Sequence, residues 1–389
     1  MPEQKEIYLD HAATTPVRQE VLEAMLPYFS ENYGNPSSLY SVAEKSKDAI
    51  EDSRREIASV LGCRPNEVVF TSGGTESDNA ALKGVALASK EFGKHIITSS
   101  IEHHAVLDSC KFLENHLGFK VTYLPVDNYG RVDPQDVHNS LTQETILVSI
   151  MYANNEIGTI QPISEISNVI KSFSQTINRD IPFHTDAVQA AGYLDLDVET
   201  LGVDLLSLSG HKVYGPKGIG ILYIKQNTPF IPHQSGGGQE RGYRSGTENV
   251  ANIVGMAEAL QLSENEKEEE SRRCIKIRDS IIHNILSKDL KIKLHGDPKE
   301  RLPNNINFGL DDIDGEMLVL NLNAVNIFTS TGSACSSSSP EPSHVLQAIG
   351  IHRETAWNSL RITLGKDSRE QDSTYITENF VKAINNLRS

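Results

Sequence analysis

The segment SLSGHKVYGPKGIG, residues 207–220, is the most informative stretch of the chain for both fold and chemistry. The apolar runs VDLLSLS (203–209) and GIGILYI (218–224) flank its Gly/Pro-rich turn, which predicts two strands joined by a tight connection. The polar residues that follow the first strand are Ser209, His211 and Lys212. A lysine in this position is most often a solvated surface residue, but beside an aldehyde cofactor it can form a Schiff base.

Short apolar runs alternate with longer amphipathic segments through the first three-fifths of the chain. Strands are predicted at 67–72, 95–100, 121–126, 145–153, 182–188, 203–209 and 218–224, and helices at 76–92, 105–117 and 163–175. Strands rich in Val, Ile and Leu that alternate with helices predict an α/β fold with a mostly parallel sheet, covered by helices on both faces. In such sheets the functional residues gather beyond the carboxyl ends of the strands.

The last third of the chain has a different pattern. Residues 248–286 predict one long helical region, and its charged middle, ENEKEEESRR, is either a solvated helix face or a break between two helices. Beyond it, segments such as LPNNINFGL and ETAWNSLRITLG predict a smaller α+β domain. We therefore expect a large domain at 16–258 and a small domain formed by 1–15 and 259–389.

The charge balance of the 389-residue chain limits its partners. There are 36 Lys and Arg residues against 52 Asp and Glu residues, which gives a net charge of −16. A chain this acidic has no global attraction for nucleic acid or an anionic membrane surface. The N-terminal residues lack the basic and apolar regions of a signal peptide, and no apolar stretch reaches the length of a membrane span, so we expect a cytoplasmic protein.

The four cysteines, at positions 63, 110, 274 and 335, form no C-x-x-C pair, which argues against both a disulfide framework and a zinc site. Cys110 and Cys274 lie in helical patterns and are expected to pack in the interior, and Cys63 falls at a helix-ending turn. Cys335 is different, because it stands in STGSACSSSSPEP (330–342), which has too few apolar side chains to join a core. We expect an exposed loop there.

Two more loops contain candidate ligand-binding residues. In TSGGTES (71–77), Gly73 and Gly74 join a strand to a helix whose N-terminal N–H groups can bind an anion, although many such turns are purely structural. In HTDAVQA (184–190), Asp186 ends a strand, where it either caps the next helix or pairs with a cation such as a protonated ring nitrogen. A phosphate, an aldehyde and a ring nitrogen together describe pyridoxal 5′-phosphate (PLP).

Motifs along nearly the whole chain point to a known family. They are YLDHAATTPV (8–17), YGNPSS (33–38), FTSGGTESDN (70–79), SIEHHAV (100–106), NNEIGTIQP (154–162), HTDAVQ (184–189), SGHKVYGPKGIG (209–220), GGGQERGYRSGTENV (236–250), TGSACSS (331–337) and SLRITLG (359–365). In this order and spacing the set is highly specific. The chain resembles the cysteine desulfurases of the NifS/IscS type, which are class-V aminotransferases with the fold-type I (aspartate aminotransferase-like) architecture of PLP enzymes.

The resemblance implies how the cofactor is held. Lys212 matches the Schiff-base lysine, Asp186 the partner of the pyridine nitrogen, and Gln189 the residue that contacts the phenolic oxygen of the ring. The matches to the phosphate-binding residues are Gly74, Thr75, Ser209 and His211, together with Thr247, which in the family reaches the phosphate of the neighbouring subunit. A homodimer with shared sites is therefore expected.

The remaining matches concern the substrate. His103 matches the histidine that stacks on the cofactor ring and serves as a second acid/base beside Lys212, whereas His104 is expected at the surface. Asn155 matches a residue near cofactor and substrate, and Arg361 matches the arginine that binds the substrate carboxylate with its bidentate guanidinium. Cys335 matches the thiol that takes sulfur from L-cysteine as a persulfide and leaves L-alanine.

The resemblance also implies a sulfur-acceptor protein, either an iron–sulfur scaffold or a relay toward thio-cofactors and thiolated tRNA. It leaves open a transient iron–sulfur ligation by Cys335 on such a scaffold, and it implies no metal site, no direct nucleic-acid binding and no membrane. The alternatives are a selenocysteine lyase or another class-V relative, and a catalytically silent scaffold. The loop that carries Cys335 favours the desulfurase over the lyase, and the presence of Lys212, Asp186 and Cys335 argues against a silent relative.

Overall fold

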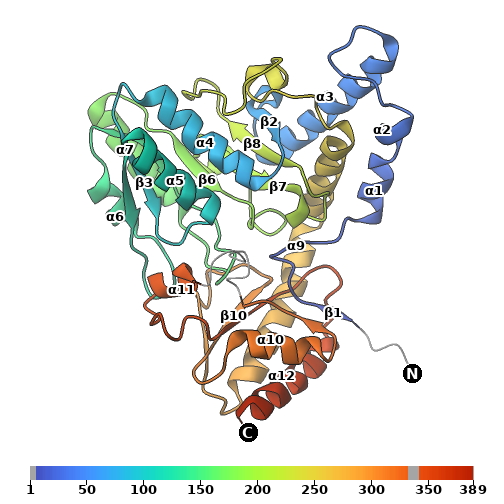
Figure 1. The fold of residues 1–389 in the computed structure, drawn as a ribbon, viewed down its shortest axis with the longest axis vertical. Helices are drawn as coiled ribbons and strands as arrows, with labels where there is room; N and C mark the ends of the chain where they lie inside the picture. Colours follow the sequence, from blue (N-terminus) through green and yellow to red (C-terminus); the bar gives the residue numbers. More distant parts are fainter. Residues whose placement is uncertain (1–5, 332–340, 389) are drawn as a thin grey trace.

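The computed structural model describes residues 6–331 and 341–388 (Figure 1). The predicted exposed loop around Cys335 lies outside the described residues. Within the described ranges, no helix combines the length and the hydropathy that a membrane span requires.

A seven-stranded sheet forms the larger part of the molecule. Its strands are β2 (Val68–Thr71), β3 (His95–Ser99), β4 (Lys120–Leu124), β5 (Thr145–Ser149), β6 (Phe183–Asp186), β7 (Leu205–Ser209) and β8 (Gly220–Ile224), in the order β2-β8-β7-β6-β5-β3-β4. Strand β8 runs antiparallel to both of its neighbours, and the other pairs are parallel. The predicted α/β class with a mostly parallel sheet is confirmed.

Helices cover both faces of this sheet. They are α1 (Gln19–Met25), α2 (Pro27–Ser30), α3 (Ser41–Leu61), α4 (Gly74–Ser89), α5 (His104–Leu117), α6 (Pro134–Ser140), α7 (Ile163–Ile177) and α8 (Val198–Leu201). Strand β2 shows the double coverage: Val68 and Phe70 belong to the core cluster under α3 and α7, whereas Val69 belongs to the cluster under α4 and α5. Because successive side chains of a strand point to opposite faces, a sheet buried on both sides needs continuous apolar runs.

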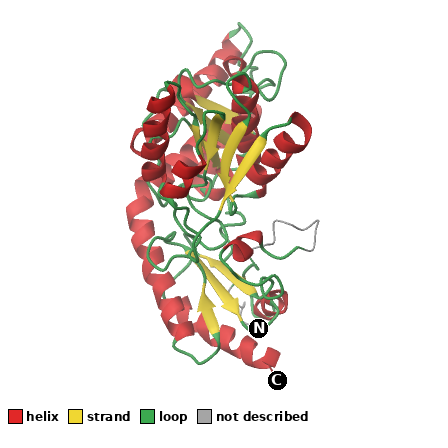
Figure 2. Ribbon diagram, turned by 90° about the vertical axis from the view of Figure 1, so that its left-hand side faces the viewer, coloured by secondary structure: helices red, strands yellow, loops and turns green. Residues whose placement is uncertain are grey.

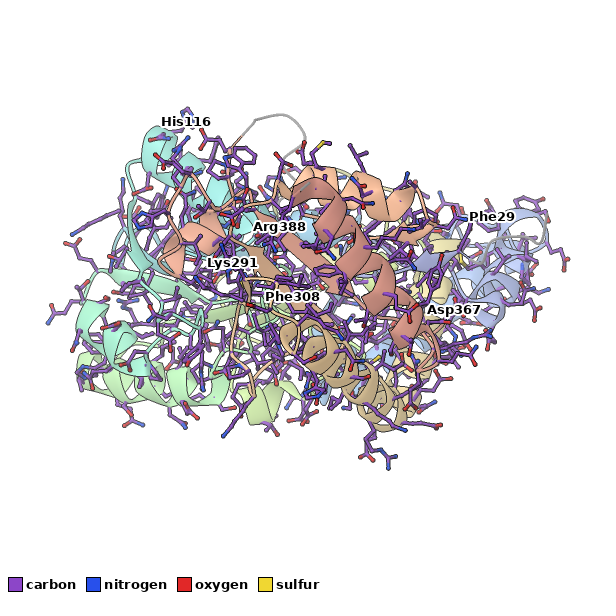
Figure 3. All side chains as sticks on the ribbon, turned by 90° about the horizontal axis from the view of Figure 1, so that it is seen from below. Phe29, His116, Lys291, Phe308, Asp367 and Arg388 are labelled. Carbon is purple, nitrogen blue, oxygen red and sulfur yellow. The ribbon has the colours of Figure 1, made fainter. Side chains whose placement is uncertain are left out.

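A smaller α+β region lies at the other end of the molecule. It contains β9 (Ile292–Leu294), β10 (Asn305–Leu310) and β12 (Ser359–Thr363) in one antiparallel sheet, the parallel pair β1 (Ile7–Tyr8) and β11 (Ile327–Phe328), and helices α10 (Gly315–Asn323), α11 (His344–Ala348) and α12 (Asp372–Arg388). Phe308, labelled in Figure 3, packs from β10 against Phe380 of α12 with ring centroids 5.8 Å apart. This region therefore has a core of its own.

One helix joins the two regions. Helix α9 (Val250–Leu286) has 37 residues and runs along the molecule from the large sheet to the small one (Figure 2). Of the two alternatives for the charged segment in its middle, the break is wrong, because the helix is continuous. The predicted boundary between residues 258 and 259 falls inside this helix, and the division into two domains stays a prediction.

The outer edge of β2 is closed by charged side chains. Arg54 of α3 donates to the Val68 carbonyl (2.8 Å), and Arg241 donates to the same oxygen (2.7 Å). Glu240 accepts from the Phe70 N–H (3.0 Å) and binds Arg54 through both oxygens (2.8 and 2.9 Å). An open strand edge exposes unpaired backbone groups, and these contacts pair them. The Arg54 and Glu240 side chains are each only 3% exposed.

We predict that Glu240→Ala lowers the free energy of unfolding by about 3 kcal/mol, because the Arg54 guanidinium loses its buried carboxylate partner and keeps only Glu51, whose side chain is 45% exposed. Thermal and urea unfolding measure the effect. The control is Asp52→Ala, which removes the solvent-exposed partner of Arg55 and should change stability little. Equal melting temperatures for the two variants would show that the edge contacts add no stability.

Candidate active site

The carboxyl ends of the parallel strands meet at one edge of the large sheet, and most of the predicted site residues lie there. Gly73 follows β2, Asp186 ends β6, and Ser209 ends β7. A pocket of about 400 Å³ opens at this edge. Its lining includes Thr14, Gly73, Gly74, Thr75, Ser209 and His211. Loops beyond strand ends are where open α/β sheets bind their ligands.

The first turn of α4 is built to receive an anion. Its first intrahelical backbone bond is donated by Ser77 to the Gly73 carbonyl (3.1 Å), so the N–H groups of Gly74, Thr75 and Glu76 have no carbonyl within the helix to bond. A Cβ at Gly74 would lie 2.8 Å from a methyl carbon of Val188, so only glycine fits there. Free N–H groups and the positive end of a helix dipole together favour a phosphate.

The carboxylate of Glu76 lies in this same turn and would repel an anion if it were free. It accepts from the Ser72 N–H (2.8 Å) and forms an ion pair with Nε of Arg244 (3.0 Å). Burial acts to raise the pKa of Glu76, but the hydrogen bonds from Arg244 and Ser72 outweigh it, and the pKa is lowered. Arg244 thus neutralises the acid beside the anion-binding turn.

Lys212 points its ammonium at the N-terminal segment. Nζ donates to the carbonyl oxygens of Ala12 and Ala13, the latter at 2.8 Å. Gln189 donates its amide to the same Ala12 oxygen (3.1 Å), and the Thr15 N–H donates to the His211 carbonyl (2.9 Å). This N-terminal segment was identified as a motif in the sequence but was given no role at the site, although it contacts the lysine that was expected to form the Schiff base.

Asp186 is buried at the end of β6. Its Oδ1 accepts from the Val188 N–H (2.9 Å). The alternative that Asp186 caps a helix is wrong, because turns follow it and the next helix, α8, begins only at Val198. A carboxylate accepts through two oxygens, and the Val188 N–H occupies one of them. Burial raises the pKa of Asp186 to about 6, against the opposing effects of the Val188 N–H and the positive charge of Lys212. A second cation near this carboxylate would favour its ionised form.

His103 is the N-cap of α5, and its Nδ1 accepts from the Ala105 N–H (3.1 Å). Because Nδ1 accepts, the proton of the neutral ring is on Nε2. Burial first, and then the charge of Lys212, lower the pKa of His103 to about 4, so the ring is neutral at pH 7. His104 is exposed, and its ring lies 5.0 Å from that of His344.

Arg361 of β12 approaches from the small region. Its side chain is 1% exposed, and Nη2 forms an ion pair with Asp10 (2.7 Å). Nη1 donates to the backbone carbonyl of Asn155 (3.2 Å). The backbone N–H of Arg361 donates to Ser330 (2.7 Å), two residues before the segment that carries Cys335. The structure therefore brings together the two residues that were expected to contact the substrate, Arg361 and Asn155.

The predicted residues that line this pocket are Gly74, Thr75, Ser209 and His211, whereas its lining does not include Lys212, Asp186, Gln189, His103, Asn155 or Arg361. Thr247 is exposed and does not belong to the lining, although its loop is tied to the anion-binding turn by the ion pair of Arg244. Cys335 lies outside the described residues. The three described cysteines are poor nucleophiles, because burial raises the pKa of each thiol, to about 12 for Cys63 and higher still for Cys110 and Cys274.

Sequence reasoning missed a group of buried acids beneath the site. Glu102 is fully buried and accepts from Ser99 Oγ (2.6 Å) and the Met151 N–H (2.9 Å). Asp78 of α4 is also buried, and Nε2 of His184 lies 3.6 Å from its Oδ1. The signal was available, since both acids belong to quoted motifs, SIEHHAV and FTSGGTESDN. In the described part of the chain, no group of His, Cys, Asp or Glu could hold a metal ion.

The residues present fit PLP. The turn with unpaired N–H groups and no room for a Cβ at Gly74 suits a phosphate. The buried carboxylate of Asp186 suits a protonated ring nitrogen, and the neutral His103 ring suits stacking. Lys212 supplies the amine for an aldehyde. These residues come from four different strand ends and together form one contiguous site.

Comparison with known proteins shows the family of the chain. The family model described as Aminotransferase class-V matches residues 7–374. A protein from Methanosarcina thermophila named cysteine desulfurase IscS is 53% identical over 387 residues, which cover 100% of this chain and 94% of the relative. One from Dictyoglomus turgidum with the same name is 50% identical over 385 residues, covering 99% and 96%.

Solved structures show the same architecture. A structure titled NifS-like protein superposes with a TM-score of 0.91 at 37% identity, covering 98% of this chain and all of the other. A second, titled SspA in complex with cysteine, has a TM-score of 0.80 at 40% identity and covers 92% and 99%. With the sheet, the pocket and the motifs in agreement, the chain belongs to the class-V aminotransferase family and, within it, to the cysteine desulfurases of the NifS/IscS type.

Proposed function

We propose that this protein is a PLP-dependent cysteine desulfurase that takes sulfur from L-cysteine, releases L-alanine and passes the sulfur to an acceptor. The observation that carries the proposal is the meeting, at one sheet edge, of Lys212, Asp186 and the open N-terminal turn of α4. The relatives named cysteine desulfurase favour this activity over a selenocysteine lyase. A related structure was solved with cysteine, which supports the substrate.

PLP supplies an electron sink that stabilises a carbanion at Cα of the bound amino acid. Lys212 holds the cofactor aldehyde, and its amine then moves the Cα proton. Asp186 keeps a positive charge on the ring nitrogen, since a buried carboxylate is most stable beside a cation. His103, with its Nε2 proton, covers the ring and serves as a second proton donor.

We propose that Cys335 accepts the sulfur. Its thiolate attacks the sulfur of L-cysteine, so that an S–S bond forms as the substrate C–S bond breaks. The carbon that loses sulfur takes up a proton, and L-alanine leaves. The other three cysteines are unsuited to this step because burial holds their thiols protonated. An acceptor protein, such as an iron–sulfur scaffold or a sulfur relay, then takes the persulfide sulfur.

The protein is further proposed to act as a homodimer in the cytoplasm. Thr247 is exposed, and the ion pair between Arg244 and Glu76 fixes its loop beside the anion-binding turn. A threonine presented in this way can donate to a phosphate held by a second copy. This arrangement supports two sites that share residues across the dimer.

Two buried acids beneath the site, Glu102 and Asp78, have raised pKa values, which favours the negative charge on Asp186 instead. Burial raises the pKa of Glu102 to about 8, and the two hydrogen bonds that it accepts only partly oppose this shift. Burial and the neighbouring Asp186 also raise the pKa of Asp78. Glu102 therefore stays protonated at pH 7 and does not compete with Asp186 for the charge of the ring nitrogen, and the raised pKa of Asp78 weakens its competition.

An assay with L-cysteine and a reductant tests the function. We expect the wild-type protein with PLP to be yellow, to be bleached by borohydride, and to release alanine and sulfide. Lys212→Ala should abolish turnover, and Cys335→Ala should bind L-cysteine, as a change in cofactor absorption shows, but release no sulfide. The control Cys63→Ala should keep full activity. Normal sulfide release by Cys335→Ala would exclude the persulfide step.

The protonated state of Glu102 predicts a dependence of stability on pH. Between about pH 5 and pH 8 the unfolded chain has lost this proton while the folded chain keeps it, so Glu102 makes the fold less stable as pH rises, by about 1.4 kcal/mol per pH unit. Glu102→Gln should remove that part of the slope when unfolding is measured across this range. The control Glu23→Gln, at an exposed position, should leave the slope unchanged. An unchanged slope in Glu102→Gln would show that Glu102 is ionised.

For the shared site, we predict that Thr247→Ala weakens PLP binding about 10- to 100-fold, the loss expected for one hydrogen bond to a charged group. Equilibrium dialysis measures PLP binding, and sedimentation measures the assembly, which should remain a dimer. Thr176→Ala, on the exposed side of α7, is the control. A monomeric wild-type protein with full PLP affinity would contradict the shared site.

A further inference from the structure

The guanidinium of Arg361 has a buried donor that nothing in the described chain satisfies. Nη2 is bound to Asp10 and Nη1 to the Asn155 carbonyl, but Nε is buried with no hydrogen-bond partner among the described residues. Buried donors are nearly always paired, so an orphan calls for an explanation. A substrate carboxylate that binds the side of the guanidinium containing Nε would supply the missing acceptor.

Asp10 is itself held by backbone contacts from several directions. Strand β1 pairs with β11 just before it, with Tyr8 opposite Phe328. Asp10 then forms a bridge with Thr363 of β12, and its carbonyl accepts from the Tyr8 hydroxyl (3.0 Å). The Asp10 side chain is 19% exposed, against 1% for its partner Arg361. The carboxylate therefore meets the guanidinium from a fixed backbone position.

We propose that Asp10 is a positioning residue for substrate recognition, which fixes the plane of Arg361 so that its Nε side is left for the substrate carboxylate. This inference rests on the proposed function and adds a residue to the same site. Because Asp10 binds Nη2 and the Asn155 carbonyl binds Nη1, the guanidinium can neither rotate nor tilt freely. A planar guanidinium binds a carboxylate well only when its N–H groups are aligned with the two carboxylate oxygens.

Asp10 also makes the buried position of Arg361 tolerable. A guanidinium that is almost fully buried without a counter-charge is strongly disfavoured and would turn toward another acid. One such acid is Glu156, which is buried, accepts a hydrogen bond from Ser343 (2.5 Å) and is influenced by the charge of Arg361. Removal of the Asp10 charge should thus reorient the guanidinium toward Glu156 and away from the substrate.

The test compares two amines that differ only by the carboxylate, L-alanine and ethylamine, both added to the PLP-loaded protein. Their dissociation constants follow from the change in cofactor absorption, without turnover. We expect Asp10→Asn to raise the dissociation constant of L-alanine about 10-fold, the loss expected for a charge-assisted contact, and that of ethylamine less than about 2-fold. In steady state, KM for L-cysteine should rise while kcat stays within about 2-fold.

Asp367→Asn is the matched control, because it removes one exposed acid at the outer surface of the small region (Figure 3) and should change neither constant. Asp10→Glu keeps the charge but moves the carboxylate by one methylene, so it should give a smaller loss for L-alanine alone; it replaces Asp10→Asn if that variant fails to load PLP. Equal losses for both amines would overturn the inference and assign Asp10 a purely structural role. Tighter L-alanine binding would also overturn it, since Asp10 would then compete with the substrate.

The outcome is separate from that of the proposed function. If the wild-type protein forms no alanine from L-cysteine, the proposed function fails. The dissociation constants of the two amines still show whether Asp10 affects binding of the carboxylate. If the wild-type protein releases alanine but Asp10→Asn binds L-alanine normally, the positioning role fails and the desulfurase stands.

Discussion

A carboxylate buried at the end of a central strand requires positive charge close by, and the polar edge of the large sheet is arranged around that requirement. The positive charge of Lys212 acts on Asp186, and burial raises the pKa of two neighbouring acids, to about 8 for Glu102 and well above its usual value for Asp78. The neutral His103 adds no cation of its own. A second positive charge is therefore favoured beside Asp186, and the protonated ring nitrogen of PLP would supply it.

The N-terminal segment joins this edge to the small region. Within six residues, Asp10 forms an ion pair with Arg361, and the carbonyls of Ala12 and Ala13 accept hydrogen bonds from Lys212. The backbone N–H of Thr15 donates to the His211 carbonyl. A single short stretch thus contacts both the residue expected to hold the cofactor and the residue expected to hold the substrate. Its effect on either group is transmitted through fixed backbone contacts, so the two groups are positioned relative to each other.

Much of this arrangement follows from local sequence. The strands of the large sheet are continuous apolar runs, and the residues that end them, such as Asp186 and Ser209, are found by counting from those runs. What local sequence could not supply are contacts between distant segments. The pairing of Arg54 with Glu240 joins residues 186 positions apart, and that of Asp10 with Arg361 joins residues 351 positions apart. The charged middle of α9 was ambiguous for a related reason, because charge alone does not distinguish a solvated face from a break.

The continuity of α9 has a mechanical consequence. A helix of 37 residues rises about 55 Å, and it is stiff because each turn is held by backbone hydrogen bonds. The helix packs against the large sheet near its start and carries the small sheet near its end (Figure 2). If the helix tilted as a rigid body by about 5° at Asn249, its other end, at Leu286, would be displaced by about 5 Å. A change in the packing of α9 against the large sheet would therefore displace the region that bears Arg361, unless the contacts of the N-terminal segment resist it.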